Sequence, residues 1–203
     1  METPSGPARV TLQPVKRPRA GLVLGHGAAG GVQARDLVAA ADAARAEGVS
    51  VALVEQPYRV AGRRSPAPAA HLDAAWTMVV ERLSAGPFTG LPLVAGGRSS
   101  GARVACRTAA ATGATGVLCL AFPLVPPGRT RDGMPKASRL PELEAVDVPV
   151  LIVQGERDPF GRPPAAPGRE VVAVPGDHSL RSARQEVARA VAAWLPGVVG
   201  ARA

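Results

Sequence analysis

The chain has 203 residues, of which 46% are hydrophobic and 20% are charged, and its formal net charge is +8. This length suits one domain, and the longest apolar stretch, residues 116–125, is far shorter than the roughly 20 residues that a membrane-spanning helix needs. We therefore expect no membrane span. The basic residues are scattered without interleaved aromatic side chains, so we expect no nucleic-acid partner either.

Seven short runs of β-branched and leucine-rich sequence predict strands. They are Val10–Leu12, Gly21–Leu24, Val51–Val54, Pro92–Ala95, Gly116–Leu120, Val150–Val153 and Glu170–Val174. Most are continuously apolar, which is typical of strands that are covered on both faces. Helical patterns separate them, so the sequence predicts an α/β fold with a mostly parallel sheet of about seven strands and helices on both faces.

Four of the intervening segments have helical periodicity. Helices are expected over Gln33–Glu47, around the apolar stripe of Leu72, Trp76, Val79 and Leu83, from Ser100 toward Gly113, and after Ser182. Gly48 ends the first helix, and Ser182 and Gln185 have the spacing of a capping box for the last one. In that last helix, Val187, Val191, Trp194 and Leu195 form the predicted buried stripe.

The remaining segments predict loops and one domain. Pro-rich stretches at Tyr58–Pro68, Phe122–Lys136 and Phe160–Gly168 predict loops, and no insertion is long enough for a cap domain. We expect a disordered N-terminus at residues 1–8, followed by a single domain at residues 9–199. Cys106 and Cys119 are isolated in a predicted helix and strand, as buried thiols of a reducing compartment would be, so we expect a cytoplasmic protein.

A serine lies between the fourth predicted strand and the helix that follows it. Gly97-Arg98-Ser99-Ser100-Gly101 has the pattern G-x-S-x-G of a nucleophile turn. Glycines permit the crowded turn that exposes the hydroxyl, and the N-terminus of the next helix points toward developing negative charge. The pattern predicts that Ser99 is a nucleophile, although a glycine-rich turn with a chance serine has the same letters.

A serine nucleophile needs a base that is itself held by an acid. His178 precedes the last helix and Asp158 follows the sixth strand, so each candidate lies after a strand, where parallel sheets gather their sites. The chain order Ser99, Asp158, His178 predicts a triad. Taken singly, Asp158 could be a turn carboxylate and His178 a loop histidine, and Asp177 and Glu156 are weaker candidates for the acid.

The glycine cluster Gly25-His26-Gly27-Ala28-Ala29-Gly30 allows two interpretations. As G-x-G-x-x-G it is a dinucleotide-binding turn, with Glu55 as the ribose ligand. Alternatively, the N–H groups of Ala28 and Ser100 form an oxyanion hole, and the ring of His26 is hydrogen-bonded beneath the loop. We favour the oxyanion hole, because the dinucleotide interpretation leaves the Ser–Asp–His order unexplained.

Four motifs together resemble those of the dienelactone-hydrolase-like α/β-hydrolases. They are Gly25-His26-Gly27-Ala28-Ala29-Gly30, Gly96-Gly97-Arg98-Ser99-Ser100-Gly101-Ala102-Arg103, Gly155-Glu156-Arg157-Asp158-Pro159-Phe160-Gly161 and Gly176-Asp177-His178-Ser179. The chain is similar to the small uncapped branch with the testis-expressed-thirty proteins and the hydrolase-like region of NSL complex subunit three. The resemblance spans about Ala20 to Leu195, and it implies an α/β-hydrolase fold, a Ser99–Asp158–His178 triad and no cofactor. Ser100 departs from this branch, where methionine is common.

These patterns predict a serine hydrolase that acts on small ester, thioester or lactone substrates through an acyl-enzyme on Ser99. A small acyl compound is then the expected partner. The histidines are dispersed and no C-x-x-C or H-E-x-x-H pattern occurs, so we expect no metal. Two alternatives stay open, which are a non-catalytic binding module with the same fold and a Rossmann-type dinucleotide-binding protein.

Overall fold

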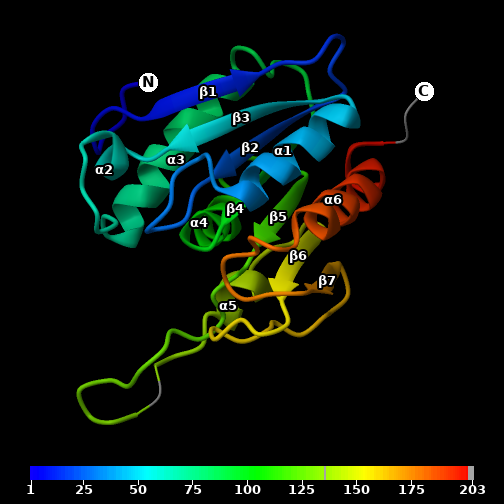
Figure 1. Ribbon diagram of the computed structural model, residues 1–203. Coiled ribbons are helices and arrows are strands. Elements are labelled where there is room, and N and C mark those ends of the chain that lie inside the picture. Colours follow the sequence, from blue (N-terminus) through cyan, green and yellow to red (C-terminus); the bar gives the residue numbers. More distant parts are fainter. Residues whose placement is uncertain (135, 201–203) are drawn as a thin grey trace.

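A seven-stranded sheet forms the centre of the computed structural model, which describes residues 1–134 and 136–200 (Figure 1). The strands are β1 (Arg9–Gln13), β2 (Ala20–Gly25), β3 (Val49–Glu55), β4 (Leu93–Arg98), β5 (Gly116–Leu120), β6 (Val150–Gly155) and β7 (Arg169–Val174). Their order is β1-β3-β2-β4-β5-β6-β7, and neighbours are parallel except for β1, which runs antiparallel to β3. All seven predicted strands and the α/β fold are confirmed.

The burial of each strand follows from its place in the sheet. Every residue of the inner strands β2, β5 and β6 is buried, whereas the edge strands β1 and β7 are largely exposed or half-buried. Continuous apolar sequence is therefore found where helices cover both faces, as predicted.

Helices cover both faces of the sheet (Figure 1). α1 (Arg35–Ala46) and α6 (Arg184–Val199) pack on one face, and α3 (Ala69–Ser84) and α4 (Ser100–Thr108) pack on the other. Two short helices, α2 (Pro57–Val60) and α5 (Leu140–Glu144), lie in connections. None of the connections in the described part of the chain forms a cap domain, as predicted, and none of its helices has the length and apolar content needed to cross a membrane.

Two local predictions differ from the structure. α2 overlaps the predicted loop at Tyr58–Pro68, because Pro57 presets the first helical position. The capping box at Ser182 and Gln185 is wrong. A turn from Leu180 to Ala183 delays the start of α6 to Arg184, and the Ser182 hydroxyl lies 3.5 Å from the carbonyl of Pro175 instead.

The N-terminal residues 1–8, which we expected to be disordered, contact the body of the protein. The amino group of Met1 donates a hydrogen bond of 2.8 Å to the carbonyl of Ala8, and Ala8 is buried. The hydroxyl of Ser5 donates to the carbonyl of His71 at 3.1 Å. The first bond closes the segment on itself, and the second joins it to α3 before β1 begins.

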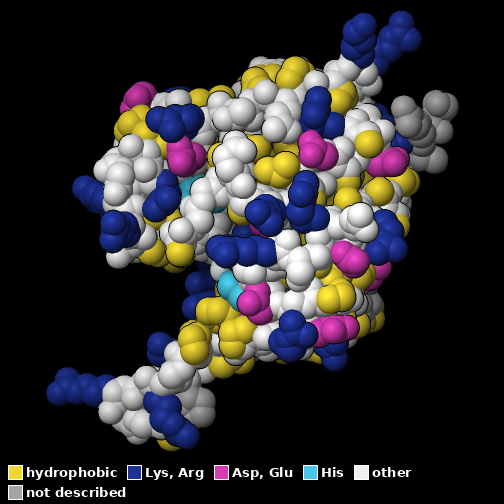
Figure 2. All heavy atoms as spheres, viewed as in Figure 1, with side chains coloured by type: hydrophobic (Ala, Val, Ile, Leu, Met, Phe, Trp, Pro, Cys, Tyr) yellow, Lys and Arg dark blue, Asp and Glu magenta, His cyan; other side chains and the backbone are white. Residues whose placement is uncertain are grey.

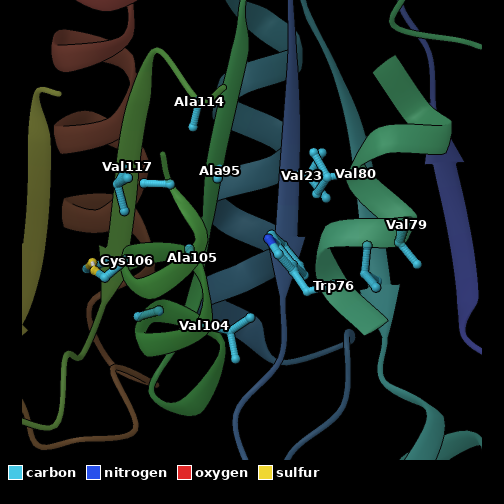
Figure 3. Close-up of a cluster of buried hydrophobic side chains, with 14 of the residues drawn as sticks. Val23, Trp76, Val79, Val80, Ala95, Val104, Ala105, Cys106, Ala114 and Val117 are labelled. Carbon is cyan, nitrogen blue, oxygen red and sulfur yellow. Dashed lines mark hydrogen bonds between the residues drawn. The ribbon is translucent and has the colours of Figure 1, made fainter. Parts of the chain in front are cut away.

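The core has one apolar layer on each face of the sheet. Figure 3 shows part of the layer under α3 and α4, in which Trp76 is the largest fully buried side chain. A Cβ atom at Gly25 would lie 3.1 Å from the Trp76 ring and 3.4 Å from the Cα of Gly101. The absence of a side chain at Gly25 therefore lets α3 and α4 approach the end of β2, where the candidate site lies.

Candidate active site

Ser99 lies in the sharp turn between β4 and α4. Its φ of 53° and ψ of −107° are costly for a residue with a side chain. The turn is held by its surroundings, since the Ser99 N–H donates to the carbonyl of Leu120 at 2.9 Å. A Cβ atom at Gly97 or Gly101 would lie 2.5 Å from the carbonyl oxygen of Gly25. The two glycines of the G-x-S-x-G pattern are thus required by the close approach of β2.

The structure brings the three predicted triad side chains into one hydrogen-bonded chain. Nε2 of His178 lies 2.9 Å from Oγ of Ser99, and Nδ1 of His178 lies 2.8 Å from Oδ2 of Asp158. Because a carboxylate only accepts hydrogen bonds, we assign the imidazole proton to Nδ1, which leaves Nε2 to accept from the serine hydroxyl. The Asp158 side chain is 1% exposed and that of His178 is 19% exposed, so the chain leads from the interior to the surface.

The carboxylate of Asp158 has two further donors. The side-chain amide of Gln154 donates to Oδ2 at 2.7 Å, and the N–H of Phe160 donates to Oδ1 at 2.9 Å. Gln154 is fully buried, and its amide nitrogen also lies 3.1 Å from the carbonyl oxygen of Phe122 and 2.9 Å from that of Gly161, so its two hydrogens are shared among three acceptors. The sequence reasoning missed Gln154, although a polar residue in an otherwise apolar strand, four positions before Asp158, was the available signal.

Neither weaker acid candidate reaches the base. The carboxylate of Asp177 accepts from the N–H and the hydroxyl of Ser179, at 2.8 and 2.6 Å, and these bonds lower its pKa. Glu156 is exposed to solvent. On the imidazole itself, the ring of Phe160 lies 4.4 Å away between centroids, at an angle of 40°. Asp158 is therefore the acid that the fold places at His178.

The glycine loop after β2 passes next to the serine. A Cβ atom at Gly27 would lie 3.5 Å from the Cβ of Ser99. His26 is buried, and as predicted its ring is hydrogen-bonded beneath the loop. Its Nδ1 donates to the carbonyl of Gly27 at 2.8 Å, and its Nε2 accepts from the N–H of Gln56 at 3.1 Å. Burial lowers the pKa of His26, which keeps the ring neutral for this pair of bonds.

The dinucleotide interpretation of the same loop is wrong. In the Rossmann fold the first parallel strand lies between the second and the fourth, whereas β2, the first parallel strand here, lies between β3 and β4, the second and third. Glu55, the proposed ribose ligand, is paired with Arg9 of β1 at 3.0 Å. The strand order is therefore not that of a Rossmann fold, and the carboxylate expected to bind the ribose is paired with an arginine instead.

A basic hollow lies beside the hydrogen-bonded chain. It has a volume of about 620 Å³, and the residues that line it include Gly30, Arg35, Arg98, Ser179 and Arg181. Figure 2 shows Lys and Arg side chains gathered on this face, near the first turns of α1 and α6. The hollow therefore joins the glycine loop to the loop of the histidine.

Several solved structures have a similar fold. An α/β serine hydrolase homologue from Coxiella burnetii is 15% identical with a TM-score of 0.73, over 96% of this chain and 95% of that one. A serine hydrolase without a lid from Xanthomonas campestris is 21% identical with a TM-score of 0.72, over 96% and 93%. A dienelactone hydrolase from Anabaena variabilis is 15% identical with a TM-score of 0.73, over 94% and 92%.

Sequence comparison gives the family directly. No curated protein matches the chain with significance. Residues 18–190, however, match the family described as "Alpha/beta hydrolase domain". The match includes the strands from β2 to β7 and nearly half of α6, and it leaves out β1. The match extends over far more than half of the chain and agrees with the sheet order and the lidless fold, so the protein belongs to the α/β-hydrolase superfamily.

Proposed function

We propose that this protein is a serine hydrolase that cleaves small ester, thioester or lactone substrates through an acyl-enzyme on Ser99. The observation that carries the proposal is the chain of hydrogen bonds from Ser99 Oγ through the imidazole of His178 to Asp158. A binding module has no need for a strained serine turn aligned with a histidine 79 positions away and with an aspartate 20 positions before that histidine.

The first step forms the acyl-enzyme. Nε2 of His178 takes the hydroxyl proton of Ser99 while Oγ attacks the carbonyl carbon of the substrate, which gives a tetrahedral intermediate. The imidazolium that forms is stabilised by the carboxylate of Asp158. His178 then returns the proton to the leaving oxygen or sulfur as its bond to the carbonyl carbon breaks. In a lactone the leaving oxygen stays tethered to the acyl group.

The backbone N–H groups of Ala28 and Ser100 are the proposed donors to the intermediate's oxyanion. Ser100 is the first residue of α4, so its N–H lies at the positive end of a helix dipole. The support for Ala28 is the hydrogen bond from His26 to the carbonyl of Gly27. Because C=O and N–H point in opposite directions in a trans peptide, this bond turns the N–H of Ala28 away from His26.

The second step releases the acid. A water molecule gives a proton to Nε2 of His178 and attacks the acyl carbon, and the collapse of the second intermediate restores the Ser99 hydroxyl. No group besides these side chains and water is required to balance either step. The proposed reaction therefore needs no cofactor, which agrees with what the family resemblance implies.

Labelling with a fluorophosphonate probe tests the proposal without knowledge of the substrate. We expect the wild type to be labelled at Ser99, Ser99→Ala to be unlabelled, and Ser100→Ala to be labelled normally. With a short p-nitrophenyl ester, Ser99→Ala should lower kcat by roughly 10⁴–10⁶, whereas Ser100→Ala should cost little. An unlabelled, folded wild type would favour the binding module, and labelling of Ser100 would refute the choice of nucleophile.

A further inference from the structure

Arg98, the residue directly before Ser99, joins segments that are far apart in the sequence. Its Nε lies 2.9 Å from Oδ2 of Asp36 in the first turn of α1. Its Nη2 donates a hydrogen bond of 3.0 Å to the backbone carbonyl of His178. The guanidinium of Arg98 thus contacts both α1 and the backbone of His178, from the position next to Ser99 in the chain.

The third nitrogen of the same guanidinium faces the glycine loop. A Cβ atom at Gly27 would lie 2.8 Å from Nη1 of Arg98, and one at Gly30 would lie 3.9 Å from it. The loop that carries Ala28 therefore packs on the guanidinium, and glycine at position 27 leaves the room for it. Arg98 contacts the base loop and the glycine loop at the same time.

Burial makes the pair of Arg98 and Asp36 costly to disturb. The side chain of Asp36 is 1% exposed and that of Arg98 is 15% exposed. The other carboxylate oxygen of Asp36 accepts from the N–H of Leu37 at 3.0 Å, which orients the carboxylate toward Arg98. A buried charge that loses its partner has neither water nor a counter-ion, so each residue holds the other in place.

We propose that Arg98 is a positioning residue for the reaction at Ser99, and that Asp36 holds its guanidinium so that the backbone of His178 stays at the distance at which Nε2 meets the serine hydroxyl. This inference rests on the proposed function and adds to it a second support of the base. Asp158 orients the imidazole from its Nδ1 side, whereas Arg98 sets the position of the backbone from which the imidazole extends.

Arginine is required because one planar group must meet the carboxylate of Asp36, the carbonyl of His178 and the backbone at Gly27 at the same time. Lysine keeps the positive charge for Asp36, but its single ammonium cannot also reach the carbonyl of His178 and support Gly27. Displacement of a catalytic group by about 1 Å typically costs about 10²-fold in rate. Loss of the arginine fork should therefore appear in the chemical step and not in substrate binding.

The test compares Arg98→Lys with Arg103→Lys. Arg103 is a matched control, because it lies in α4, is 25% exposed and forms a two-pronged pair with Glu142. Its link to Ser99 is a backbone hydrogen bond, which the change to lysine keeps. The rate of fluorophosphonate labelling and kcat for a short p-nitrophenyl ester should fall about 10- to 100-fold in Arg98→Lys, with KM changed less than about threefold. In Arg103→Lys both rates should stay within about twofold of the wild type.

A purely structural role for Arg98 predicts another result. Both variants would then lose thermal stability, and the folded fraction of each would label and turn over at the wild-type rate, which would overturn the inference. If Arg98→Lys does not fold, Asp36→Asn takes its place, since it removes the charge and keeps the shape. We expect slower labelling with unchanged KM there as well, and a full wild-type labelling rate in Asp36→Asn would overturn the inference.

The outcome for the wild type separates this inference from the proposed function. If the wild type is neither labelled nor active, the proposed function fails, and the inference fails with it. If the wild type is labelled at Ser99 and Arg98→Lys matches it, only the positioning role of Arg98 is overturned.

Addition of millimolar guanidinium to Arg98→Ala gives a further check, because rescue of the labelling rate requires an acceptor site at Asp36 and the carbonyl of His178.

Discussion

The side-chain amide of Gln154 donates a hydrogen bond of 2.7 Å to Oδ2 of Asp158, the same oxygen that accepts from Nδ1 of His178. Gln154 lies in β6 and is itself held by the carbonyls of Phe122 and Gly161. Asp158 is thereby held by the sheet as well as by the turn in which it lies. In this arrangement the strand determines the direction from which Asp158 meets the imidazole.

Replacement of Gln154 by methionine should weaken both activity and stability. Gln154→Met keeps the length of the side chain but leaves Asp158 with one donor fewer in a buried place. We expect kcat for an ester substrate to fall about tenfold and the free energy of unfolding to fall by about 1–3 kcal/mol. Gln185→Met, at an exposed position in α6, is the control. Unchanged kcat in Gln154→Met would show that the turn alone orients Asp158.

Asparagine at two of the candidate acids distinguishes Asp158 from Asp177, the residue directly before His178. Asp158→Asn keeps the shape but no longer stabilises the imidazolium, so kcat should fall by about 10²–10⁴-fold. Asp177→Asn should change kcat by less than about threefold, because its carboxylate contacts Ser179 and not the imidazole. Steady-state kinetics of the two purified variants provides the measurement. The reverse order of effects would reassign the acid.

A methyl group at Gly97 should disrupt the serine turn. Its Cβ would lie 2.5 Å from the carbonyl oxygen of Gly25 and 2.8 Å from the backbone carbon of Gly101, neither of which can move without a shift of β2 or α4. Gly97→Ala should therefore lower the free energy of unfolding by about 1–3 kcal/mol or more. Gly197→Ala, in α6 with open space at its Cβ, should leave the stability unchanged or raise it by up to about 1 kcal/mol. Chemical denaturation measures both, and equal stability of the two variants would contradict the close packing.

The buried ring of His26 should make stability depend on pH. Burial lowers the pKa of His26 in the folded protein below its ordinary value of 6.5. As the pH falls below that value, the unfolded chain binds a proton that the folded protein does not, so stability present at higher pH is lost. The loss is at most about 1.4 kcal/mol per pH unit.

His26→Gln removes this titration and provides the comparison. Between about pH 7.5 and 5, the free energy of unfolding of the wild type should fall more steeply than that of His26→Gln, because all other groups titrate alike in both. Urea denaturation at each pH measures the two curves. Parallel curves would mean that His26 binds its proton equally well in the folded protein.

The sequence by itself determined the seven strands, the α/β fold and the three residues of the hydrogen-bonded chain. This was possible because these features depend on local patterns. A strand that is covered on both faces needs a continuous apolar sequence, and the strained turn at Ser99 needs glycine at positions 97 and 101. The chain order of serine, aspartate and histidine then follows from the order of strand ends along the sheet.

Only the tertiary structure decided which polar side chains support that chain. The sequence analysis did not single out Gln154, and the partner of its side chain depends on how the turn after β6 folds back. The pairing of Arg98 with Asp36 and with the carbonyl of His178 joins three segments separated by 62 and 80 positions. Such contacts depend on strand register and on the placement of α1 against the sheet, and neither leaves a periodic pattern in the chain. The sequence therefore identifies the three side chains of the hydrogen-bonded chain, whereas the packing of distant segments decides how they are held.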